Sequence, residues 1–283
     1  MMRRASAFQN EHRRLVLGLS AIIAVAIVVT LIVGSRRIAA TQEARIADRY
    51  ADAVEQLRSD DLKVRLRGIR ELERIAKDSP AKSGPIMQTL TAFVRENAPC
   101  KKSQMTITTT PVPSSTATPQ APRPCMDIQA ILAVIGSMPR RDEDYVSLDL
   151  QGADLQSANL IWSNFRGANL SDANLRGADL SGIDLSYTNL RNANLGRASL
   201  FDADLSGSDL SRANLGEADL REGNLSETDL TGTDLNRADL SDANLTGAYI
   251  RDQNDGRRLV TDEQLSAARS LAGATMPDGN THE

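Results

Sequence analysis

A leucine falls on every fifth position through most of the C-terminal half of the chain. Residues 148–250 hold 21 consecutive five-residue units, 19 of them centred on leucine, with Phe165 and Ile250 as the exceptions. The residue before the centre is Asp or Asn in 19 units, and the residue two before it is Ala in 13 units and Ser, Thr or Gly in six. An unbroken register of this length indicates a structural repeat.

A period of five fits neither a helix nor a flat strand. On an α-helix, five residues turn the side-chain direction by about 140°, so the leucines would spiral around the axis. On a strand, an odd period sends successive leucines to opposite faces. The pattern therefore predicts a chain that turns a corner in every unit, with its leucines and small residues pointing inward. The predicted core includes Leu155, Leu175, Leu195, Leu215 and Leu235.

Runs such as Ala153-Asp154-Leu155, Ala168-Asn169-Leu170 and Ala243-Asn244-Leu245 resemble the pentapeptide-repeat proteins. The resemblance implies a mainly β fold over residues 145–252, a right-handed quadrilateral β-helix with four units per coil. By that rule the units make about five coils, and strands about 4.8 Å apart give a rod about 24 Å long. Because each coil contacts only its neighbours, stability should be nearly one-dimensional.

The N-terminal end carries a candidate membrane segment. Residues 15–34 are uncharged and follow a basic tail at residues 1–14. About 20 apolar residues cross a hydrocarbon core of about 30 Å, so we predict a single transmembrane helix at residues 15–35. A cleaved signal peptide is the alternative, but its apolar region is shorter, and this run ends in Arg36-Arg37. Arginines flank the span equally, so the positive-inside rule gives no orientation.

Three helical patterns follow over residues 38–98 and predict a small three-helix unit. We expect the second helix to begin at Asp60 or Asp61 and the third at Ser83, with Pro85 in its first turn. A span followed by Arg49-Tyr50-x3-Val54-x2-Leu57 resembles a membrane-attached subgroup of the same family, although that subgroup often has two spans. This resemblance implies that the repeat lies in the cytoplasm.

Residues 99–125 are rich in proline and threonine, and they predict an extended, semi-rigid linker. Cys100 and Cys125 flank this linker. In an oxidising compartment the two cysteines could close the loop as a disulfide, but nothing in their spacing requires it. We expect two free thiols.

The ends of a β-helix are strand edges that invite another chain, so each end should be covered. Ile128, Ile131 and Ile135 form an apolar helical stripe, which predicts an N-terminal capping helix within residues 126–140. Thr261 suits a helix N-cap. It predicts a second capping helix within residues 257–283, ending at Gly273.

The sequence offers no constellation for catalysis. His12 and His282 lie at the two ends, and no His, Cys and carboxylate spacing suits a metal. No glycine-rich phosphate loop is present. Ten of the 16 acidic residues between 145 and 250 occupy the slot before leucine, where Asn also occurs, which indicates a structural role. We therefore predict no enzyme, no cofactor and no metal, and the net charge of −4 argues against nucleic-acid binding.

With four units per coil, Ile161, Trp162 and Phe201 share one outer face, and Tyr187 lies on the next. Exposed apolar patches often mark contacts, so these four residues form the candidate interaction patch. The alternative is that Ile161 and Trp162 pack beneath the N-terminal cap or the linker.

These observations predict a single-span protein of the cell membrane that presents a polar rod to an unidentified protein partner or to a second copy. The family resemblance offers an alternative, because some pentapeptide-repeat proteins are acidic dimeric rods that mimic duplex DNA and bind type II topoisomerases. The repeat has 16 acidic and seven basic residues, which agrees in sign. However, the arginines interrupt the acidic surface, and a membrane anchor would hold the rod away from the chromosome.

Overall fold

The computed structural model describes residues 41–98, 125–138, 148–251, 257–259, 265–266, 268–278 and 280–282. The chain forms two compact units, residues 1–52 and residues 53–283. The described part of the first unit, residues 41–52, is helical. The predicted span at residues 15–35 and most of the linker lie outside the described residues. Within the described ranges, no helix is both long and apolar enough to cross a membrane.

The second unit begins with helical residues 53–57 and continues with α2 (Leu62–Asp78) and α3 (Pro80–Asn97). Asp61 is the N-cap of α2, and its Oδ1 accepts the Lys63 backbone N–H at 2.7 Å. Helix α3 starts three residues before the predicted Ser83, because Pro80 itself occupies the first turn. Pro85 therefore lies inside the helix, where it lacks the N–H for one intrahelical hydrogen bond.

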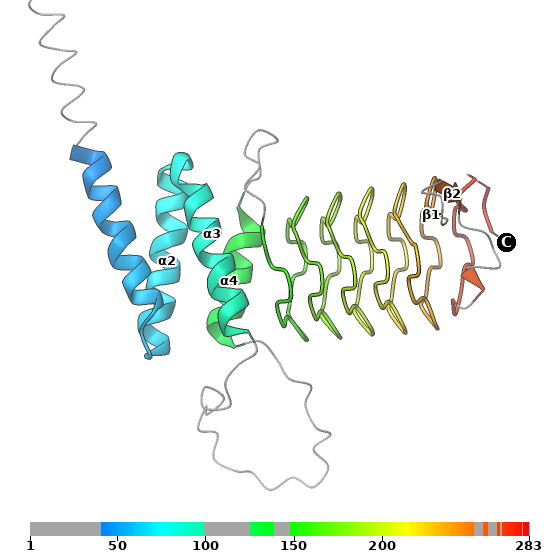
Figure 1. The fold of residues 1–283 in the computed structure, drawn as a ribbon, viewed down its shortest axis with the longest axis horizontal. Helices are drawn as coiled ribbons and strands as arrows, with labels where there is room; N and C mark the ends of the chain where they lie inside the picture. Colours follow the sequence, from blue (N-terminus) through cyan, green and yellow to red (C-terminus); the bar gives the residue numbers. More distant parts are fainter. Residues whose placement is uncertain are drawn as a thin grey trace, which may run out of the picture. The chain divides into compact units, whose positions relative to one another are not determined.

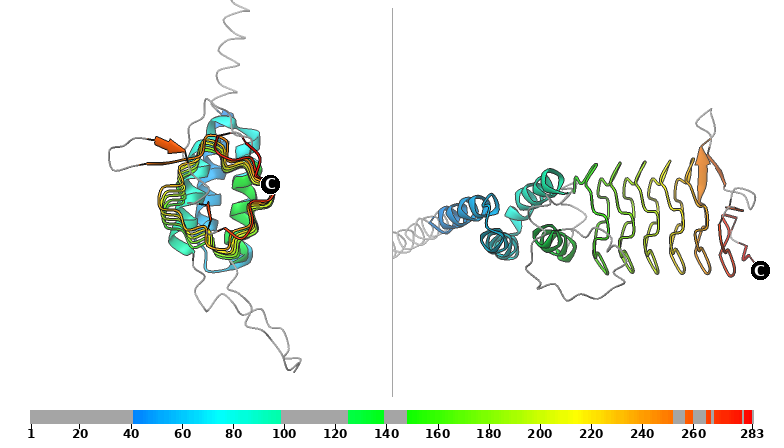
Figure 2. Two further views of the ribbon diagram at one scale, coloured as in Figure 1. Left: turned by 90° about the vertical axis from the view of Figure 1, so that its right-hand side faces the viewer. Right: turned by 90° about the horizontal axis from the view of Figure 1, so that it is seen from below.

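Parallel pairing between residues 20 apart builds the repeat region into a stack of four-sided coils. The first bridge joins Asp149 to Asn169, and the series continues in register to Asp229 and Tyr249. Viewed along their stacking direction, the coils superimpose (Figure 2). The predicted quadrilateral β-helix of four units per coil is therefore present, and we call residues 148–251 the rod (Figure 1).

Each unit turns its corner through a type II turn. The N–H of Ala153 donates to the carbonyl of Leu150 at 3.1 Å, and the same bond recurs along the rod. Every fifth residue from Gly152 to Gly247 has positive φ, and thirteen of these residues are not glycine. A positive φ at the third position defines a type II turn and normally selects glycine. The rod therefore carries backbone strain at many corners.

The rod's interior is filled by the predicted leucines. Leu155, Leu175, Leu195 and Leu215 are fully buried, and Leu235 is 6% exposed beside the last regular coil. Buried alanines stand two positions before most of these centres. Phe165 replaces leucine in the first coil and is also fully buried.

Helix α4 (Met126–Ser137) covers the N-terminal end of the rod (Figure 1). Its Ile131 and Ile135 are completely buried. The carbonyl of Gly136 accepts the N–H of Asn164 at 3.0 Å, and Gln129 forms two hydrogen bonds with the backbone of Asn159. The helix thus binds backbone groups that an open edge would leave unpaired.

The C-terminal end differs from the prediction. Strand β1 (Tyr249–Arg251) pairs antiparallel with β2 (Arg257–Leu259). Ser270 and Thr275 then form parallel bridges with Asp239 and Asn244, at a separation of 31 residues instead of 20. The predicted helix therefore does not continue to Gly273, because Ser270 and Thr275 add two further sides to the rod and satisfy the last coil's edge. Its predicted start at Thr261 lies outside the described residues.

Candidate interaction surface

The Asp and Asn residues before each leucine hold the turns. The Oδ1 of Asp149 accepts the N–H of Gln151 at 3.3 Å, and the equivalent bond recurs from coil to coil. An amide oxygen accepts this bond as well as a carboxylate oxygen does, which explains why Asp and Asn interchange. The ten aspartates in the position before the leucine therefore have a structural role, as their interchange with Asn indicates.

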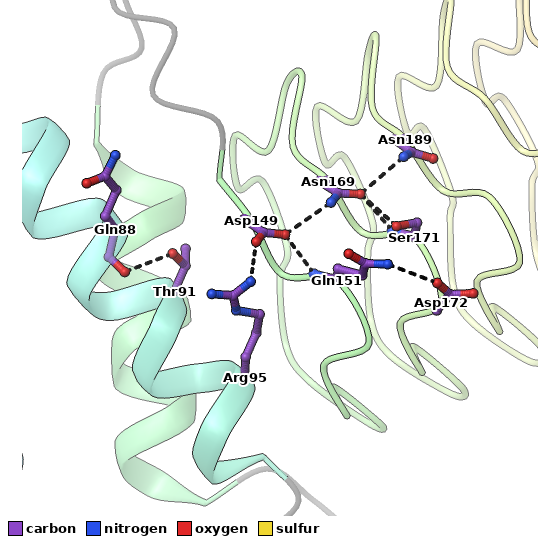
Figure 3. Close-up of polar contacts among 9 residues, drawn as sticks. All are labelled: Gln88, Thr91, Arg95, Asp149, Gln151, Asn169, Ser171, Asp172 and Asn189. Carbon is purple, nitrogen blue, oxygen red and sulfur yellow. Dashed lines mark hydrogen bonds and ion pairs between the residues drawn. The ribbon is translucent and has the colours of Figure 1, made fainter.

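Asparagines in this slot also connect one coil to the next. The Nδ2 of Asn169 donates to Asp149 at 3.0 Å, and that of Asn189 donates to Asn169 at 3.1 Å (Figure 3). Arg95 of α3 forms an ion pair with the same Asp149, so this chain of side-chain contacts begins on the helical unit. Helix α3 is thereby joined to the first coil by an ion pair, and Asp149 continues the contact to Asn169.

The structure places the four candidate patch residues on two neighbouring corners of the rod. Trp162 is 73% exposed, Tyr187 60% and Ile161 39%, while Phe201 is partly exposed. Ile161, Trp162 and Phe201 lie at one corner of the rod, and Tyr187 lies at the next corner along the chain. Trp162 and Ile161 are thus not buried beneath α4.

Trp162 and Tyr187 each lie against a glycine of the following coil. A Cβ added to Gly182 would stand 2.3 Å from the Trp162 ring, and one added to Gly207 would stand 2.9 Å from the Tyr187 ring. The guanidinium of Arg166 lies over the Tyr187 ring, 4.4 Å from its centroid. The two rings therefore pack against the rod's backbone while remaining largely exposed.

Sequence reasoning missed these glycines, although their signal was available. Gly182 follows Trp162 by 20 residues, and Gly207 follows Tyr187 by 20. Because twenty residues make one coil, each aromatic residue and the glycine 20 positions later occupy the same place in neighbouring coils.

A buried ion pair ties the helical unit to the cap. Nε of Arg65 in α2 donates to Oδ2 of Asp127 in α4 at 2.7 Å, and their side chains are only 6% and 3% exposed. Arg65 also donates to the carbonyls of Ser59 and Asp60, both at 2.9 Å. The guanidinium thus holds the loop before α2 and the start of α4 together.

Cys125, the N-cap residue of α4, is disulfide-bonded. The expectation of two free thiols is therefore wrong. The chain has one other cysteine, Cys100, which lies outside the described residues. Disulfides form and persist in oxidising compartments, so this bond bears on where the rod resides.

Hydrogen bonds and ion pairs stabilise several surface carboxylates in the charged form. Hydrogen bonds from Asn192 and Gln151 lower the pKa of Asp172, and the Arg197 guanidinium lowers the pKa of Glu217. The side chain of Arg221 holds the pKa of Asp219 below its usual range. General acid catalysis near neutral pH needs a raised carboxyl pKa, so these three groups are suited to surface pairing instead.

The described residues contain no group of three His, Cys, Asp or Glu side chains that could hold a metal ion. With the rod filled by leucine and the carboxylates engaged in turns, the arrangement can bind at its outer corners. The chemistry available there is aromatic stacking, cation–π contact and carboxylate pairing.

Comparison with known protein families identifies the repeat. The family described as pentapeptide repeats matches in eight copies, over residues 148–182, 178–216 and 213–252. No curated protein matches the chain. The matches lie in the repeat and give no support to the membrane-attached subgroup.

Several solved structures are similar. A pentapeptide repeat protein of the Arabidopsis thaliana thylakoid lumen is 27% identical over 47% of this chain and 83% of its own, with a TM-score of 0.35. HetL of Nostoc sp. strain PCC 7120, involved in heterocyst differentiation regulation, is 30% identical over 47% and 74%, with a TM-score of 0.29. QnrB1, a plasmid-mediated fluoroquinolone resistance protein, is 24% identical over 36% and 50%, with a TM-score of 0.33. With its unbroken pentapeptide register and its match to the family over residues 148–252, the chain belongs to the pentapeptide-repeat family.

Proposed function

We propose that this protein is a non-enzymatic binding protein whose rod presents an aromatic surface to a protein partner. The observation that carries the proposal is the seating of Trp162 and Tyr187, which are exposed and yet fixed on Gly182 and Gly207. Aromatic anchors of this kind dominate the binding energy of many protein interfaces. A ring that is already ordered loses little conformational entropy when a partner covers it.

The proposed attachment to the membrane rests on the uncharged run at residues 15–34, which lies outside the described residues. The disulfide at Cys125 favours an oxidising compartment for the helical unit and the rod. We therefore favour the non-cytoplasmic side over the cytoplasmic placement that the family resemblance implies. Thiol labelling of protein isolated without reductant tests this choice, because a labelled Cys125 would return the rod to the cytoplasm.

The DNA-mimic alternative is less well supported by the distribution of charge. Five of the seven arginines of the repeat lie on the two corners that hold neither Trp162 nor Tyr187: Arg176, Arg191, Arg197, Arg212 and Arg237. Duplex DNA presents phosphates along both strands, whereas every corner of this rod holds an arginine, since Arg166 lies over Tyr187 and Arg221 over Phe201. Binding of purified type II topoisomerase to the full-length chain would favour the alternative.

The aromatic surface is tested by crosslinking on the intact protein in its native membrane. Replacing Trp162 and Tyr187 by serine should remove the partner crosslinks, or the crosslink of a homodimer, because the two anchors are lost. The matched control replaces two polar corner residues, the partly exposed Gln156 and the exposed Asn236, by serine. Equal crosslinking by both double variants contradicts the proposed surface.

A further inference from the structure

The start of α4 is fastened to the helical unit at two neighbouring points. Cys125, its N-cap residue, is disulfide-bonded, and the chain's one other cysteine, Cys100, comes three residues after Asn97, where α3 ends. Two positions beyond Cys125, Asp127 accepts the buried 2.7 Å hydrogen bond of Arg65. One fastening is covalent and the other is an ion pair, and both act on the first turn of the helix.

The first turn of α4 is also where this helix begins to cover the rod. The backbone N–H of Gln129 donates to the carbonyl of Cys125 at 2.9 Å and closes the turn. The side chain of the same Gln129 forms hydrogen bonds of 2.6 and 3.0 Å with the backbone of Asn159 in the first coil. Loss of this turn would therefore uncover one side of the rod's N-terminal edge.

Helix α4 has little stability of its own. It is 12 residues long, which is marginal for an isolated helix, and its N-cap residue forms no side-chain hydrogen bond to the helix. Three isoleucines, a valine and a glycine lower its helix propensity further. Contacts with the rest of the chain therefore hold the helix in place, and its first turn depends on the two fastenings.

Without the disulfide, the ion pair of Arg65 and Asp127 would be the single side-chain fastening of this turn. The pair is strong while water is excluded from it, since solvent weakens the attraction between exposed charges. Each opening of the turn lets water reach both ions. An intact disulfide limits how far the start of α4 can move in such an opening, so it favours reclosure.

We propose that the disulfide at Cys125 is a redox-sensitive fastening that keeps the cap on the rod. The reductant is a dithiol, small or protein-borne. Its thiolate attacks one sulfur of the disulfide, and its second thiol then resolves the mixed disulfide. Two electrons and two protons thus pass to the cysteine sulfurs, and the dithiol leaves as a disulfide. Cys125 is partly exposed, so the reductant can reach it in the folded protein.

In the reduced protein the first turn of α4 opens and Gln129 leaves the backbone of Asn159 unpaired. This device goes beyond the proposed binding function and is independent of it, because Trp162 and Tyr187 contact glycines of the following coils rather than α4. A failure of the redox proposal would leave the aromatic surface untouched, and the reverse also holds.

Hydrogen exchange measured by mass spectrometry tests the fastening on the full-length protein in detergent. Oxidised protein is compared with protein reduced by dithiothreitol, and alkylation counts the free thiols in each sample. After reduction the amides of α4 should exchange at least about tenfold faster, because the disulfide no longer restricts the opened state. Amides around Leu195, which is fully buried at mid-rod, should keep their rate.

The variant Cys100→Ser with Cys125→Ser is the matched control for the reductant. Without dithiothreitol its α4 amides should exchange as fast as those of the reduced protein, and dithiothreitol should not change them. Acceleration by dithiothreitol in this variant would assign the effect to the reductant itself and would overturn the proposal.

Three other results would also overturn it. If both thiols are free and the α4 amides keep their rate, the disulfide does not hold the cap. If the amides around Leu195 accelerate as much as those of α4, reduction destabilises the whole rod rather than its cap. If dithiothreitol cuts the bond only in denaturant, the disulfide is not reachable in the folded protein and is not redox-sensitive.

Discussion

The indole ring of Trp162 lies on the backbone of Gly182, one coil further along the rod. A Cβ at Gly182 would overlap the ring, whereas a Cβ at Gly177 would meet only a serine oxygen 3.8 Å away. Both glycines have nearly the same positive φ, at 64° and 63°. The two positions therefore separate the effect of ring displacement from that of backbone strain.

We expect Gly182→Ala to displace the Trp162 ring toward solvent. Its emission should move to longer wavelength, and acrylamide should quench it more strongly. Gly177→Ala should lower the free energy of unfolding by about 1 kcal/mol through φ alone and leave the emission unchanged. An unaltered Trp162 spectrum in Gly182→Ala would show that the ring is not held on the glycine.

The core leucines should dominate the stability of the rod. Leu195 is fully buried at mid-rod, so Leu195→Ala should lower the free energy of unfolding by about 2–5 kcal/mol. Arg197 stands two residues later on the surface, with its side chain 57% exposed and paired with Glu217. Arg197→Ala should cost no more than about 1 kcal/mol in chemical unfolding. Equal losses would contradict the assignment of inward and outward positions.

The regular part of the rod could be predicted because one rule repeats in it. Once the period of five is known, Leu195 and its equivalents must point inward. The Asp and Asn residues before them are then expected in the turns. The last two sides escaped prediction because the chain leaves the rod after Arg251 and returns at Ser270. That interruption breaks the register, and a segment of two units is too short to show a period.

The contacts between elements escaped prediction for a different reason. Arg65 and Asp127 are 62 residues apart and separated by the Pro/Thr linker, so no local pattern relates them. The contact of Trp162 with Gly182 also depends on knowing the number of residues per coil, since the two become neighbours only when 20 residues close one turn.

The C-terminal segment should keep the rod from pairing with a second copy. Ser270 and Thr275 accept the backbone N–H groups of Leu240 and Leu245 at 3.0 and 2.8 Å. Deleting residues 257–283 exposes those groups as an open strand edge, so the truncated protein should self-associate. Size-exclusion chromatography with light scattering measures this. A truncated chain that stays monomeric and equally stable would rule out the covering role.

Arg65 and Asp127 should contribute far more to the helical unit than the exposed pair of Arg95 and Asp149. Arg65→Met leaves a buried carboxylate without its partner, which typically costs about 3–5 kcal/mol. Arg95→Met removes a pair whose side chains are both 39% exposed, so its cost should be about 1 kcal/mol or less. Hydrogen exchange of the α4 amides should accelerate in the first variant and change little in the second.

The double variant Arg65→Met with Asp127→Leu separates charge from packing. Because it removes both ions, much of the stability lost in Arg65→Met should return, as apolar replacements of buried pairs are often neutral or stabilising. A double variant as unstable as the single one would mean that the hydrogen bonds of Arg65 to Ser59 and Asp60, rather than the unpaired Asp127, determine the loss. Protection of the α4 amides reports which of the two interactions holds the cap on the rod.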